Sequence, residues 1–215
     1  KGALDGTVAA HGFQLDHLAE LYPDQLDGLA GLLDLSLALT GDASDPTVRG
    51  ALDLKGLFAG GGVRWLDVSG PILLEHHQLV PDLKVGVAGD PLAVVSGAVP
   101  MSGGLADIAV DYDAATSLEL AFTPGAFERL VNASPALDGQ EVPPGRFSAV
   151  IQLSDTLRDP VLRLAGVSEF EVPGWTQRGR AEFDVTRRAS ELSFQSDLRE
   201  GLATRALVVG TALGI

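Results

Sequence analysis

Apolar and polar residues alternate one by one in many short runs of this chain. In the stretch 33–40 (LDLSLALT), leucine occupies every odd position and polar or small residues occupy the even ones. Successive side chains of a β-strand point to opposite faces, so this pattern is typical of a strand with one apolar face. The sequence therefore predicts a mainly β chain of one-sided strands. The same alternation recurs at 48–55, 66–68, 85–87, 108–113, 118–122, 147–153 and 181–185.

The segments between these runs are rich in turn-forming residues. The 215 residues include 26 Gly and 12 Pro, and pairs such as Gly41-Asp42 and Asp45-Pro46 interrupt the alternation at hairpin spacing. Pro46 can open a strand, because the first residue of a strand does not need its N–H for the ladder. Strands joined by such short turns favour an antiparallel sheet.

A one-sided sheet has to cover its apolar face. A second sheet would give a β-sandwich or barrel with a filled core, and the alternative is a long sheet that curls on itself. Aromatic residues make up only 6% of the chain, which is little bulk for a filled core and favours the curled sheet. Glycine within strands permits such curvature. Composition and periodicity leave both architectures open.

One motif of the sequence occurs twice. Asp45-Pro46 recurs as Asp159-Pro160, which lies 159 − 45 = 114 residues later, and Arg49 recurs as Arg163 at the same offset. A strand, an acidic turn and a second strand surround each copy. The sequence therefore predicts two copies of one hairpin at equivalent places along one sheet.

A short helical stretch precedes each copy. Apolar residues at helical spacing predict short helices over about 14–21 and 125–131, and a Leu-Asp-Gly triplet follows each of them, at 26–28 and 137–139. The internal repeat units therefore extend over about 13–56 and 127–170.

The order short helix, Leu-Asp-Gly, strand, acidic turn, Asp-Pro and strand resembles the C-terminal region of TamB, of the translocation and assembly module. That family belongs with the AsmA-like and bridge-like lipid-transfer proteins, and segments 15–56 and 124–166 carry the resemblance. By this resemblance, the fold is a long curled sheet (a β-taco, or repeating β-groove) with an apolar inner groove. Residues 1–215 would be a single fragment of a larger periplasmic protein, anchored to the inner membrane through a segment outside this chain.

The resemblance also implies a function without catalysis. The apolar groove would carry or shield phospholipid acyl chains between the inner and outer membranes of the cell envelope, and would assist outer-membrane protein assembly with an outer-membrane β-barrel assembly protein as partner. The alternative function is a β-sandwich or adhesin-type interaction module with a filled core. The residues expected to line the groove are Leu35, Leu37, Leu39, Val48, Leu52, Leu54, Phe147, Ala149, Ile151, Leu153, Leu162 and Leu164.

Charge and residue chemistry argue against other classes. A net charge of −14 repels nucleic acid, and a chain with no cysteine has no thiolate for a metal or for catalysis. Adjacent histidines at 76 and 77 would point to opposite faces of a strand, and Asp107, Asp111 and Asp113 are expected to form a solvated strand face. We therefore expect no enzyme, no metal site and no cofactor.

The outermost strands of an open sheet expose unpaired backbone N–H and C=O groups, which attract further strands. An isolated fragment of such a sheet is therefore expected to self-associate edge to edge.

Overall fold

The computed structural model describes residues 3–17, 29–59, 63–87, 89–126, 129, 145–171 and 174–213. Nearly all of these residues belong to β-strands. The fourteen strands are β1 (Ala3–Gln14), β2 (Ala30–Asp42), β3 (Asp45–Ala59), β4 (Val63–Glu75), β5 (Gln78–Val87), β6 (Asp90–Ser102), β7 (Ala109–Val110), β8 (Ala115–Phe122), β9 (Gly125–Ala126), β10 (Gly145–Thr156), β11 (Pro160–Phe170), β12 (Gly179–Arg188), β13 (Glu191–Glu200) and β14 (Ala203–Leu213).

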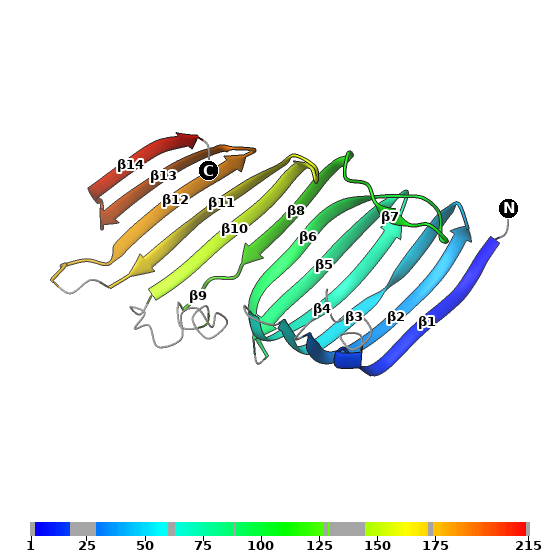
Figure 1. Cartoon of the computed structure of the whole chain (residues 1–215). Coiled ribbons are helices and arrows are strands. Elements are labelled where there is room, and N and C mark those ends of the chain that lie inside the picture. The colour runs from blue at the N-terminus through cyan, green and yellow to red at the C-terminus, as the bar shows by residue number, and fades with distance from the viewer. Residues whose placement is uncertain are drawn as a thin grey trace.

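The strands form one antiparallel sheet. Twelve of them follow one another in chain order from β1 to β14, while β7 pairs with β6 and β9 pairs with β10 beside that path. Every extensive contact between described strands joins hydrogen-bonded neighbours, and Figure 1 shows a single layer with the two ends of the chain at opposite edges. The prediction of a mainly β, antiparallel fold is confirmed. The described strands do not divide into the two packed sheets of a sandwich.

The two expected helices are wrong at their first residues, where strands stand instead. Gln14 ends β1 and Leu15 still donates its N–H to the carbonyl oxygen of Gly31 (3.0 Å), so that only Asp16 and His17 are helical there, while residues 125–126 form β9 against β10. Pairing with a neighbouring strand therefore prevails over the local helical spacing of apolar residues. The other residues of both expected helices lie outside the described ones, apart from the helical residue 129.

The strand expected at 108–113 is reduced to Ala109 and Val110, within a long connection between β6 and β8. This connection runs along the turn end of the sheet (Figure 1). At one end, the N–H of Leu105 donates to the carbonyl oxygen of Ala43 in the β2–β3 turn (2.8 Å), and at the other, the N–H of Arg158 in the β10–β11 turn donates to Tyr112 (3.0 Å). The connection thus links the turns of both Asp-Pro hairpins.

The described residues contain almost no closed core. Among these described residues, the apolar ones that are less than about a tenth exposed are Leu15, Leu54, Leu74, Ala93 and Ala149, together with the prolines Pro46 and Pro100. The chain exposes 13137 Å² for a mass of 22.3 kDa, whereas a compact protein of that mass exposes roughly 9,400 Å². The stability of the sheet therefore comes from backbone pairing and from contacts between neighbouring side chains within the layer.

Candidate functional site

The twelve residues expected to line a groove lie on one face of the sheet, which we call the apolar face. Directly opposed residues of antiparallel strands share a face. In the β2–β3 hairpin, Leu35 is opposite Leu52. In the β10–β11 hairpin, Ile151 is opposite Leu164. Strand alternation places the rest of the twelve beside these pairs: Leu37, Leu39, Val48, Leu54, Phe147, Ala149, Leu153 and Leu162.

The strands between the two hairpins continue this face without a break. One row of directly opposed residues runs from Leu54 in β3 through Val68, Val85 and Ala93 to Phe122 in β8. The next pairing, of β8 with β10, sets Leu120 opposite Ile151. The apolar face is therefore continuous from β2 to β11, although the sequence separates its two hairpins by more than a hundred residues.

Most of the apolar face is half-buried and has no second layer over it in the described part of the chain. Of the twelve residues, Ala149 is 2% exposed and Leu54 is 9% exposed, whereas Leu162 at the β11 end is 40% exposed. The other nine are intermediate. Leucine and valine side chains shield one another along the rows, but their outer surfaces stay open to solvent.

Three phenylalanines form a cluster on the apolar face. The ring of Phe147 in β10 lies edge-on to Phe122 of β8 at 5.9 Å and stacks on Phe183 of β12 at 6.3 Å. Phe183 covers Gly166, which is directly opposite it in β11. Of these three, the sequence identified only Phe147 as a lining residue. Phe122 and Phe183 do lie in alternating runs, but the alternation within one strand does not reveal which of its faces joins the face of the next strand.

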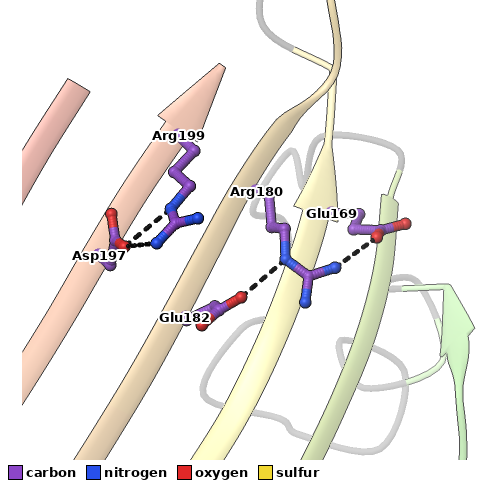
Figure 2. Close-up of polar contacts among 5 residues, drawn as sticks. All are labelled: Glu169, Arg180, Glu182, Asp197 and Arg199. Atoms are coloured by element: carbon purple, nitrogen blue, oxygen red, sulfur yellow. Dashed lines mark hydrogen bonds and ion pairs between the residues drawn. The ribbon is translucent and has the colours of Figure 1, made fainter. Parts of the chain in front are cut away.

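The opposite face, which we call the charged face, carries ion pairs over β11, β12 and β13 (Figure 2). Arg180 donates to Glu182 of its own strand (2.9 Å) and to Glu169 of β11 (3.1 Å), and Arg199 donates to Asp197 of its own strand (2.8 and 2.5 Å). The register sets Arg180 opposite Arg199 and Glu182 opposite Asp197. Like charges opposite each other are unfavourable, and the ion pairs along each strand offset that repulsion.

The two arginines of the repeated motif also lie on the charged face, and each forms an ion pair with the next strand. Arg49 of β3 donates to Glu75 of β4 through one nitrogen (3.1 Å). Arg163 of β11 donates to Asp184 of β12 through two nitrogens (as short as 2.6 Å). The hydrogen bond from Arg163, aided by its charge, holds the pKa of Asp184 below its usual range.

One hollow of about 570 Å³ lies over β10 to β13. Most of its lining belongs to the charged face, with small residues such as Ser148 and Ala165 beside Glu182 and Asp197, although Phe122 and Phe183 also contribute. Of the twelve expected groove residues only Ala149 lines this hollow, which therefore overlaps little with the expected groove. The apolar face is an open surface over the described strands.

The candidates for metal binding lie apart from this face. His76 and His77 form the two-residue turn between β4 and β5, with φ values of 51° and 56°, and not a strand as expected; both are exposed. Asp107 and Asp111 accept backbone N–H bonds within the β6–β8 connection, and Asp113 pairs with Arg158. Among the described residues, no group of three or more His, Asp or Glu side chains is placed to hold a metal ion.

Within the described part of the chain, no helix is long and apolar enough to cross a bilayer. No protein-family model, curated protein or solved structure matches this chain. The apolar face is therefore the feature of this chain that bears most on its function.

Proposed function

We propose that this chain is a segment of a TamB-like envelope protein, and that its apolar face carries or shields lipid acyl chains between the inner and outer membranes. The observation that supports the proposal most is a continuous apolar face, uncovered in the described strands, on a single layer whose other face carries the ion pairs. Acyl chains would cover this surface, and each buried CH₂ group contributes about 0.8 kcal/mol.

The dimensions of the sheet suit this role. Twelve strands side by side, at about 4.8 Å per spacing, extend over about 50 Å, which exceeds the ~30 Å hydrocarbon core of a bilayer. In this proposal the sheet curls about the acyl chains, so that the apolar face becomes the wall of a groove. Gly50, Gly70 and Gly166 on that face favour such curvature, because their missing side chains let neighbouring strands approach closely.

The same proposal includes a periplasmic location, an inner-membrane anchor outside this chain, and help with outer-membrane protein assembly. An apolar face of this kind could equally shield nascent outer-membrane strands, which also have one apolar side. The alternative, an interaction module with a filled core, requires a second layer over the apolar face, and the described strands supply none. A filled core is therefore the less favoured alternative.

A pair of adjacent substitutions tests the proposal. Leu37→Asp places a charge on the apolar face, and Ala38→Asp, on the exposed opposite face, is its matched control. We expect both variants to keep the far-ultraviolet circular dichroism and thermal unfolding of the unmodified protein, because a charge on an open face can stay hydrated. Phospholipid that co-purifies, measured by native mass spectrometry and lipid extraction, should be lost only in Leu37→Asp.

A second pair, Ile151→Asp with Ser154→Asp as control, repeats the test in the β10–β11 hairpin. If the Leu37 and Ile151 variants fail to fold while both controls fold, a buried unpaired charge is the cause, at a cost of several kcal/mol. That outcome would mean a filled core and would favour the interaction module. Folded variants that all retain the same lipid would also contradict the proposal.

A further inference from the structure

The edge strand β14 is apolar on both faces, and most of this apolar surface is exposed. Leu207, Val208 and Val209 are 61%, 50% and 68% exposed. Val208 is opposite Ser196 on the apolar face, whereas Leu207 is opposite Asp197 on the charged face. From Ala206 to Leu213 the strand has no charged residue and no proline. Such a strand is an efficient template for pairing with another strand.

The other edge of the sheet is protected. The pairing of β1 with β2 is interrupted by a bulge between Ala10 and Phe13. Within it, Gly12 has a φ of 57°, and its N–H donates to the carboxylate of Asp34 (3.0 Å). β1 also carries a charged Asp5. Bulges and charges are the features by which natural sheets discourage pairing at an edge.

We propose that β14 pairs antiparallel with β14 of a second copy of this chain, with Val208 opposite Val208. In this register Leu207 of one copy is opposite Val209 of the other, so the exposed apolar side chains of both faces cover one another. The two-fold axis runs perpendicular to the sheet and keeps both apolar faces on the same side. No charges are brought together over 206–213, whereas pairing β14 with β1 would set it against the bulge.

Sedimentation velocity of the purified 215-residue chain tests the pairing. The unmodified protein should form a dimer that dissociates on dilution, and Val209→Lys should weaken the dimer by about tenfold or more, equivalent to about 1.4 kcal/mol. Val8→Lys, at a similarly exposed position of β1, should leave the dimer intact. Circular dichroism verifies that both variants are folded. A protein that stays monomeric at high concentration, or a dimer lost only in Val8→Lys, would overturn the proposal.

Single cysteines test the register, because the chain has none of its own. Opposed residues of antiparallel strands have Cα atoms about 4.5–5.5 Å apart, within the range that a disulfide bridges. Oxidation should therefore link Val208→Cys to itself, and should leave Val8→Cys unlinked. A disulfide that forms only in a mixture of the two variants would indicate head-to-tail assembly and would refute the symmetric dimer. The outcome does not depend on whether lipid binds the apolar face, so the two proposals fail separately.

Discussion

The β2–β3 and β10–β11 hairpins have the same backbone register, but they carry side chains of different size on their apolar faces. Gly41 is opposite Pro46 in the first hairpin, and Asp155 is opposite Pro160 in the second, each 114 residues later. Gly41 and Asp155 both have a positive φ, of 98° and 71°. The two turns therefore set the same register although their sequences differ.

The difference appears in the rows of side chains that cross each hairpin. On the apolar face of the first, Leu35 and Leu52 are followed by Gly70 of β4. At the equivalent place in the second, Ala149 and Gly166 are followed by Phe183 of β12. Two large residues and a glycine in one row correspond to two small residues and a ring in the other. The backbone of a hairpin is thus fixed by its own two strands, whereas the packing of its face involves the strand beyond.

The largest effect should come from giving the second hairpin the residue of the first, as Gly166→Leu. A Cβ atom at Gly166 would lie 2.5 Å from Cζ of Phe183 and 2.7 Å from the carbonyl oxygen of Ser148, so strands and ring must move apart. We expect the free energy of unfolding to fall by about 2–3 kcal/mol in chemical denaturation. Ala165→Leu, one residue away on the charged face, should cost much less. Equal losses in the two variants would mean that the ring does not limit the space.

Exchanging the left-handed residues of the two turns should have a smaller, asymmetric effect. Gly41→Asp places a side chain where φ is 98°, which should cost about 1 kcal/mol. Asp155→Gly relieves the same strain at 71°, but it also removes an exposed ion pair with Arg188 (3.4 Å). Its effect should stay within about 0.5 kcal/mol. Thermal unfolding measures the loss of stability in each variant. Comparable losses would mean that positions 41 and 155 do not have equivalent roles in their turns.

Within a hairpin, alternation and turn residues were sufficient to predict the structure. The run at 33–40 predicted both the strand and its apolar side, because a short turn leaves only one register that keeps leucines opposite valine and leucine. The Asp-Pro pairs likewise predicted where β3 and β11 begin. The sequence therefore predicted which residues lie on the apolar face of both Asp-Pro hairpins.

Between hairpins the sequence was not sufficient. Whether Phe122 or Phe183 joins the apolar face depends on the register between strands, and bulges or long connections such as 103–114 shift it by amounts that periodicity does not encode. Residues 13 and 14 have helical spacing with the residues after them, yet they pair with β2. The sequence also did not predict that β14 is an edge strand, because an apolar run without alternation does not indicate how many neighbouring strands it has.

The smallest predicted difference concerns the arginines of the two hairpins. Arg163 binds Asp184 through two nitrogens, whereas Arg49 binds Glu75 through one. Lysine cannot reproduce a two-nitrogen contact, so Arg163→Lys should cost more than Arg49→Lys. Both costs should stay below about 1 kcal/mol, because the pairs are exposed and screened by salt. Unfolding in low salt should resolve the order, and the difference should shrink at 1 M salt. An equal cost of the two substitutions in low salt would mean that the second nitrogen of Arg163 adds nothing to stability.

The pH dependence of the unfolding free energy tests whether the charge of the Asp184 carboxylate stabilises the second hairpin. Because Arg163 lowers the pKa of Asp184 in the folded protein, the contribution of the pair to stability is complete above the unfolded pKa of about 4, and it is lost as the pH falls through the lower folded value. Asp184→Asn should therefore be less stable than the unmodified protein near neutral pH and should approach it in acid. A loss that stays constant from neutral pH to about pH 3 would instead mean that the asparagine disturbs the sheet itself, and that charge contributes nothing to the contrast between the hairpins.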